Sequence, residues 1–140
     1  MAKEDVLDLI FRLKAGCSAN ESRMMTKTGL SPAEYNGIAA MKPGDRMSGN
    51  AVSKKMGLSA SRASRVIDKM VKNGYLVREN NAEDRRKCTV SLAKKGIQIK
   101  KKIEKLRSDC EKKLREQVSE KEIDSLSTIL EKVIDVVKST

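Results

Sequence analysis

The sequence contains no histidine and only three cysteines, Cys17, Cys88 and Cys110, among its 140 residues. Without histidine, and without a Cys-x-x-Cys pair, a Cys/His zinc site is excluded. The same absence removes the commonest general base and every Ser–His or Cys–His dyad. Because we find no other catalytic constellation, we expect no enzymatic activity and no cofactor. We predict no metal site either, although the composition leaves carboxylate ligation open.

Aromatic residues and long apolar runs are also scarce. Phe11, Tyr35 and Tyr75 are the only aromatic side chains, which argues against a module that stacks single-stranded bases on several rings. No apolar run approaches the ~18 residues of a membrane span, and the first residues lack the basic-then-apolar layout of a signal peptide. We therefore expect a cytoplasmic protein with no membrane partner. Three widely spaced cysteines in that reducing compartment do not predict a disulfide framework.

Positive charge is abundant, and it is concentrated in the middle of the chain. The net charge is +11, and residues 42–102 alone contain 17 Lys and Arg against 5 Asp and Glu. The other segments are close to neutral, with 13 basic and 14 acidic side chains. A surface that only keeps a protein in solution intersperses both signs, whereas a polyanion-binding lobe concentrates one. We therefore prefer polyanion binding to a merely solvated basic face.

Helix caps and hydrophobic periodicity predict a mainly α-helical chain with one small β-hairpin. Predicted N-caps are Ser31, Ser48, Ser59 and Ser119, the first and last of them within capping boxes. In residues 88–92 apolar and polar side chains alternate, as in a half-buried strand. The expected helices cover residues 6–17 with an uncertain end, 32–41, 48–56, 59–72, 99–118 and 120–137, and the expected strands cover 75–79 and 87–92.

The two short helices at 48–56 and 59–72 are joined by Gly57-Leu58-Ser59, as in a helix-turn-helix. The hairpin follows at once, with the charged turn 80–86 between its strands. A helix-turn-helix followed directly by a charged hairpin is a winged helix. We therefore divide the chain into an N-terminal dimerisation helix region (1–30), a winged-helix lobe (31–96) and C-terminal dimerisation helices (97–140).

The helix at 59–72 is expected to read DNA. On a helical wheel at ~100° per residue, its apolar side chains gather on one side and face the core. The opposite side carries serine and cationic residues that suit the major groove, where arginine can make two hydrogen bonds to guanine. A solvated basic face is the plainer alternative, which an adjoining wing disfavours. The predicted DNA-binding residues of this helix are Ser59, Ser61, Arg62, Arg65, Lys69 and Lys72.

The turn of the hairpin supplies a second group of predicted DNA-binding residues, Asp84, Arg85, Arg86 and Lys87. Arginine at a hairpin tip can enter a narrow minor groove, where the negative potential is enhanced. We expect Asp84 to orient an arginine through a bidentate pair. A surface ion pair without function is the alternative for this aspartate.

Both ends of the chain carry apolar stripes at helical spacing. In the last helix the stripe follows the 3-4-3-4 pattern of a coiled-coil seam. The stripes can pack on the winged-helix lobe, but such a lobe has a core of its own, so we favour a homodimer that buries them. The predicted dimerisation residues are Val6, Leu9, Ile10, Leu13, Leu114, Ile123, Leu126, Leu130, Val133 and Val137.

A specific order of motifs runs from residue 47 to residue 96. After the caps come a helix with Arg62-Ala63-Ser64-Arg65, then Lys72-Asn73-Gly74-Tyr75-Leu76-Val77-Arg78, Glu83-Asp84-Arg85-Arg86 and Ser91-Leu92-Ala93-Lys94-Lys95-Gly96. This order resembles the core of the MarR family of transcriptional regulators, and the flanking helices fit that family's dimerisation region. Ala93 departs from the family's usual threonine, which leaves either a weaker helix cap or a substitute in Ser91.

The resemblance implies a triangular homodimer whose two recognition helices and two wings bind a pseudo-palindrome in double-stranded DNA. It implies that Asp84 braces the wing and that Arg86 enters the minor groove. It also implies repression, often relieved by a phenolic ligand, a metal or oxidation, and hence a small-molecule effector of unknown identity. The expected function is therefore that of a sequence-specific transcriptional regulator, most simply a repressor.

The cysteines are expected to serve packing rather than sensing. Some relatives of that family sense peroxides with a cysteine early in the first helix, but Cys17 lies closer to Ser31-Pro32 than those cysteines do. Apart from Lys14 one turn away, nothing basic in the sequence is placed to activate the Cys17 thiol. We therefore expect Cys17 to be a small buried hydrophobe.

Two other functions remain open. A winged helix can serve protein–protein contact, as an assembly or anti-repressor module. A DNA mobility-shift assay would distinguish this function from DNA binding. RNA binding is the second alternative. Scarce aromatics and a helix suited to the major groove disfavour it, because A-form RNA hides its major groove.

Overall fold

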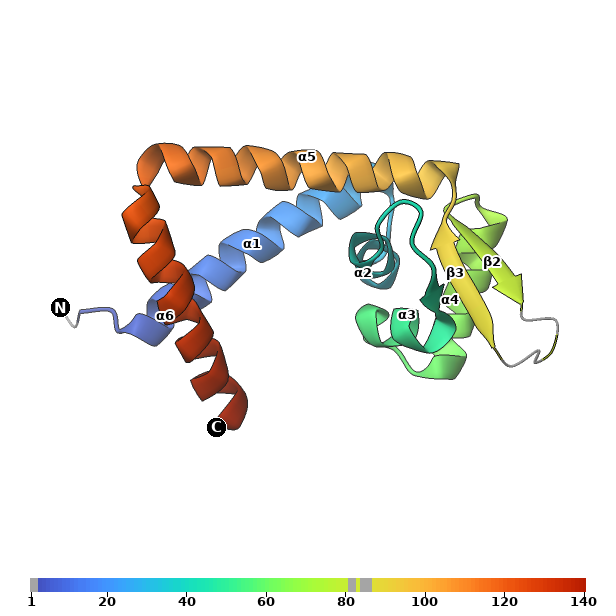
Figure 1. The fold of residues 1–140 in the computed structure, drawn as a ribbon, viewed down its shortest axis with the longest axis horizontal. Coiled ribbons are helices and arrows are strands. Elements are labelled where there is room, and N and C mark those ends of the chain that lie inside the picture. The colour runs from blue at the N-terminus through green and yellow to red at the C-terminus, as the bar shows by residue number, and fades with distance from the viewer. Residues whose placement is uncertain (1–2, 81–82, 84–86) are drawn as a thin grey trace. The chain divides into compact units, whose positions relative to one another are not determined.

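The computed structural model describes residues 3–80, 83 and 87–140. Within them the chain forms six helices and three strands in the order α1, α2, β1, α3, α4, β2, β3, α5, α6 (Figure 1). The contacts divide the chain into two compact units, Met1–Ile103 and Glu104–Thr140, and helix α5 runs through the boundary. No helix among the described residues is both long and apolar enough to cross a membrane.

Helix α1 (Val6–Thr28) is longer than the sequence predicts. It begins behind Asp5, whose side chain accepts a hydrogen bond from the backbone N–H of Asp8 at 2.9 Å. It continues through the polar stretch that follows Cys17 and ends at Gly29, which has a φ of 72°. Exposed polar residues cost little in a helix, and one interior glycine costs only about 1 kcal/mol, so neither breaks α1.

The helix-turn-helix is confirmed. Helices α2 (Pro32–Ala40), α3 (Gly49–Met56) and α4 (Ala60–Lys72) begin behind Ser31, Ser48 and Ser59. Each serine side chain accepts a hydrogen bond from the backbone N–H three residues later, which satisfies a donor that the helix cannot. Gly57 ends α3 with a φ of 70°, a conformation that glycine adopts without strain, and it allows the sharp turn into α4.

The wing hairpin is confirmed, and a third strand accompanies it. Strands β2 (Leu76–Asn80) and β3 (Cys88–Leu92) pair antiparallel, and each begins one residue later than predicted. Strand β1 (Met47–Ser48) pairs with the other edge of β3, so the sheet order is β1-β3-β2. The sequence does not predict β1, because two residues carry no periodicity and one of them already serves as a helix cap.

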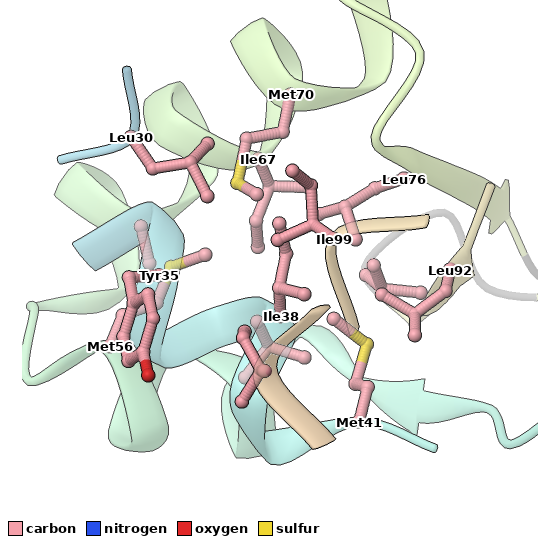
Figure 2. Packing of buried hydrophobic residues seen from close by; sticks show 14 residues of the cluster. Leu30, Tyr35, Ile38, Met41, Met56, Ile67, Met70, Leu76, Leu92 and Ile99 are labelled. Carbon is pink, nitrogen blue, oxygen red and sulfur yellow. The ribbon is translucent and has the colours of Figure 1, made fainter. Parts of the chain in front are cut away.

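The core of the first unit lies between its helices and the inner face of the sheet. Ile38, Met41 and Met70 are completely buried, and Ile67 is nearly so. Figure 2 shows Ile38 of α2, Ile67 of α4 and Ile99 of α5 reaching the middle of this cluster from three helices. Burying an apolar side chain of this size contributes about 1.5–3 kcal/mol, so the cluster is what holds α4 in place.

Helices α2 and α3 approach each other closely at Gly37. A Cβ atom there would lie 2.7 Å from Cε of Met56. The Tyr35 ring lies beside Met56 in the same region (Figure 2). Burial raises the pKa of the Tyr35 phenol above its ordinary value, with a smaller contribution from Glu21. Tyr35 is therefore a neutral member of the core.

Helix α5 (Lys94–Gln117) starts without a side-chain cap at Ala93. The Ala93 carbonyl accepts from the backbone N–H of Ile97, and its own N–H donates to the carbonyl of Tyr75, both at 2.9 Å. Backbone bonds therefore fix the start of α5, while Ser91 lies within β3. Two turns after Ala93, the buried Lys100 donates from Nζ to the carbonyl oxygen of Ala39 at 2.5 Å, which ties α5 to the end of α2.

Helix α6 (Glu120–Ser139) begins at the predicted capping box. The Ser119 side chain accepts from the Glu122 backbone, and the Glu122 carboxylate accepts from Ser119 in return. These hydrogen bonds hold the pKa of Glu122 below its ordinary value. The cap is therefore complete when this carboxylate is ionised.

The expectation that the cysteines are packing residues is partly wrong. Cys17 and Cys110 are exposed, and only Cys88 is half-buried. Helix α1 contributes no buried residue along its length, and the buried residues of α5 all lie before Glu104. Apolar residues at helical spacing are predicted to lie on one face of a helix. The spacing does not show whether that face packs against other residues of the same chain.

Candidate nucleic-acid interface

Helix α4 presents one apolar face and one polar face, as predicted. Ala63, Ile67 and Met70 are buried against the core. All six residues predicted to bind DNA from this helix and its cap are exposed: Ser59, Ser61, Arg62, Arg65, Lys69 and Lys72. The core thus fixes one side of α4, and the other side offers four cationic side chains to a ligand.

The first turn of α4 combines a cap with a polar surface. The Ser59 hydroxyl accepts from the backbone N–H of Arg62 at 3.4 Å and lies 3.4 Å from the Ser61 hydroxyl. The Ser59 side chain therefore serves mainly as the N-cap of α4, whereas the side chains of Ser61 and Arg62 are exposed in its first turn. The N-terminus of a helix also carries a partial positive charge, which favours phosphate nearby.

Of the predicted wing residues, the structure places one. Lys87 is exposed and lies directly before β3. Asp84, Arg85 and Arg86 lie outside the described residues, so the bracing role of Asp84 and the minor-groove role of Arg86 remain predictions. The strands that carry this turn are placed, and β2 packs beside α4 while β3 packs beside α3 in the same unit (Figure 1).

Arg78 is a residue of the site that the sequence analysis missed. It lies on β2, and its guanidinium forms an ion pair with Asp68 of α4. Its Nη2 also donates to the Ser64 carbonyl oxygen at 3.5 Å. Alternation in the strand could have revealed it, because Arg78 shares the inward face with Leu76.

A pocket of about 220 Å³ lies between α3, α4 and the sheet. Its polar lining includes Asn50, Ser53, Ser64, Arg78 and Lys87, and Cys88 contributes a thiol. Within the described part of the chain, the Arg78 Nε atom is buried without a hydrogen-bond partner. The pocket thus adjoins both α4 and the base of the wing.

Four exposed lysines outside α4 were not among the residues predicted to bind DNA. Lys54 and Lys55 lie in the last turn of α3 and are exposed. Lys94 and Lys95 begin α5 and are exposed as well, and the Lys95 ammonium lies 5.8 Å from the centre of the Tyr75 ring. The concentration of charge in residues 42–102 could have indicated them. No periodic motif singles them out.

The predicted dimerisation residues leave a large apolar surface on each unit. In the first unit Val6, Leu9 and Leu13 are more than half exposed on α1, and Ile10 is partly exposed. In the second unit Leu114, Leu126 and Val137 are exposed, Leu130 and Val133 are partly exposed, and Ile123 is buried. Exposed apolar residues outside the predicted set enlarge the two surfaces, namely Leu7 and Phe11 on α1 and Ile129, Ile134 and Val136 on α6.

A helix-turn-helix whose second helix exposes a cationic face, followed by an antiparallel hairpin, defines a winged helix-turn-helix protein. Residues 28–87 match the model of the MarR family, and they contain α2, β1, α3, α4 and β2 but end before β3. Over residues 28–87 the chain is therefore similar to the MarR family.

Several solved structures share the fold at low sequence identity. A mutant of S. aureus MepR is 15% identical, with a TM-score of 0.74 over 96% of this chain and 99% of that one. A MarR family transcriptional regulator from Silicibacter pomeroyi is 20% identical, with a TM-score of 0.70 over 94% of each chain. NadR in complex with 4-hydroxyphenylacetate is 10% identical, with a TM-score of 0.70 over 95% of each. No curated protein sequence matches the chain.

Proposed function

We propose that the protein is a transcriptional regulator that binds double-stranded DNA as a homodimer and acts as a repressor at a pseudo-palindromic operator. The observation that carries this proposal is the exposed face of α4, where Arg62, Arg65, Lys69 and Lys72 lie opposite a packed core. The hairpin beside α4 supplies a second element that can reach DNA. An α-helix fits the major groove of B-form DNA, and arginine suits the edge of guanine.

Homodimerisation is the second part of the proposal. Two winged helices that bind one pseudo-palindrome must associate with each other. The exposed apolar residues of α1 and those of α6 each offer a surface for that association. We place the half-site centres roughly 10 bp apart, about one turn of DNA. We assign no catalytic role to any residue.

An effector is the third part of the proposal. The pocket beside Arg78 is lined by α3, by α4 and by the base of the wing, so a ligand there would contact both DNA-reading elements. Arg78 and Lys87 favour an anionic group, and Ala60 and Ile67 favour an apolar body. Loss of operator binding on titration with small organic anions, followed by fluorescence anisotropy, tests this site.

Binding to duplex DNA should weaken steeply as salt rises. Each phosphate that a lysine or arginine neutralises adds about −0.9 to the slope of log affinity against log salt concentration. The four cationic residues of α4, present twice in a dimer, should make the slope steeper than about −4. Anisotropy titrations over a range of potassium chloride measure it. A slope near zero would contradict DNA binding and favour a protein–protein module.

Arg65→Ala should lower operator affinity by about 1–3 kcal/mol and relax base preference at one position of each half-site. Arg65 lies near the centre of the exposed face of α4, so its guanidinium is placed to reach base edges. Arg115→Ala is the matched control, because Arg115 is an exposed arginine of α5 paired with Glu111. Titration of single-base operator variants measures both. An Arg65→Ala protein that keeps the parent's base preference would show that Arg65 does not read sequence.

A further inference from the structure

Strand β2 places a charged residue, Arg78, on the inner face of the sheet. Arg78 lies opposite Val90 of β3, which is completely buried, and two residues after Leu76, which is buried as well. A strand that packs on a core alternates apolar and polar residues, so an apolar side chain is expected at this position. The arginine is therefore an exception that packing alone does not explain.

The guanidinium of Arg78 reaches the recognition helix rather than solvent. Its side chain is 23% exposed, and its Nη1 pairs with Oδ1 of Asp68, whose side chain is 59% exposed. Its Nη2 donates to the backbone carbonyl of Ser64, one turn earlier in α4. One side chain of the wing thus contacts α4 through both a carboxylate and the backbone.

Asp68 is the only acidic residue in the sequence of α4, and it shares the exposed side of the helix with Arg65, Lys69 and Lys72. An unpaired carboxylate on this side would repel DNA phosphates. The pair with Arg78 neutralises the carboxylate, so that the cationic residues set the charge of this face.

We propose that Arg78 is a positioning residue for DNA binding. It neutralises Asp68 and ties α4 to β2, and it thereby holds the recognition helix and the wing in one mutual orientation. The inference rests on the proposed DNA-binding function. Stability does not require the pair, because an apolar residue of similar length would suit the inner face of the sheet, and the Asp68 left behind is hydrated.

The test is a double-mutant cycle of Arg78→Met and Asp68→Asn, with operator affinity and melting temperature measured for each protein. Arg78→Met should bind operator roughly tenfold more weakly at physiological salt, since each half-site regains a negative charge next to phosphate. Its melting temperature should be no lower than the parent's. The double variant Arg78→Met/Asp68→Asn should bind operator about threefold more tightly than Arg78→Met alone. The negative charge of Asp68 is then removed, but the contact of Arg78 between β2 and α4 is still missing.

Arg115→Met is the matched control, because it breaks an exposed arginine ion pair on α5 and should leave operator affinity unchanged. Three results would overturn the inference: Arg78→Met binding as well as the parent, a loss of affinity that only accompanies a lower melting temperature, or no recovery with Asp68→Asn. A parent protein that binds no duplex DNA would instead refute the proposed function, so the two failures are distinguishable.

Discussion

Replacing Leu126 and Val137 of α6 together by glutamate should convert the proposed dimer to monomers and weaken operator binding about 100-fold or more. Both side chains are exposed in the single chain, by 41% and 55%, so the substitutions remove little intrachain packing. In the proposed dimer they would carry carboxylates into an apolar seam. An unpaired buried charge costs several kcal/mol, which is enough to separate the subunits.

The loss of DNA affinity follows from the loss of the second half-site. In a dimer, binding of one winged helix brings the other to its half-site at a high effective concentration. A monomer contacts one half-site only, and about half of the phosphate contacts disappear with the other. The salt slope should therefore also fall to about half of the parent's value.

Thr128→Glu is the control for this experiment. Thr128 is exposed on α6, on the side of the helix opposite the seam, and its hydroxyl donates to the Asp124 carbonyl. Adding a carboxylate there should leave both the dimer and operator binding intact. Analytical ultracentrifugation at micromolar concentration distinguishes the two states. A parent protein that sediments as a monomer, or a double variant that still forms dimers, would exclude α6 as the interface.

The helices could be predicted well because their signals are local. A serine at Ser31 or Ser119 and a glutamate three residues later form a reciprocal hydrogen-bonded box that needs no other part of the chain. The extent of α1 could not be predicted in the same way, because the polar residues after Cys17 carry no apolar period. Strand β1 is wholly non-local, since its two residues become a strand only by pairing with Val90 and Thr89.

The candidate site was predictable where it depends on helical period. The 3.6-residue repeat of α4 separates Ala63 and Ile67 from Arg65, and the structure confirms that separation. The role of Arg78 was not predictable, because its partner Asp68 lies ten positions away on another element. The exposure of Cys17 was not predictable for a related reason. A stripe of apolar residues on a helix does not reveal which other part of the protein, if any, packs against that stripe.

Gly96→Ala should destabilise the winged-helix lobe by about 3 kcal/mol, despite placing a better helix former in α5. A Cβ atom at Gly96 would lie 2.1 Å from the carbonyl oxygen of Tyr75 and 3.2 Å from Cδ2 of Leu92. The carbonyl cannot move away freely, because it accepts from the backbone N–H of Ala93 at 2.9 Å. The N–H of Tyr75 itself donates to the carbonyl oxygen of Met70, so a shift would also disturb helix α4.

Gly16→Ala makes the same substitution in α1 and should have the opposite sign. Within the described part of the chain, no atom beyond the helix's own backbone lies within 4 Å of a Cβ placed at Gly16, and the residue is exposed. Alanine there should stabilise the chain by about 0.5–1 kcal/mol, because glycine loses more backbone entropy on helix formation.

Thermal unfolding followed by circular dichroism measures both variants. Gly96→Ala should lower the melting temperature by about 10 °C, whereas Gly16→Ala should raise it by a few degrees. Equal stability of the two variants would mean that the backbone at Tyr75 can move away from Gly96 without cost, contrary to the close approach between them.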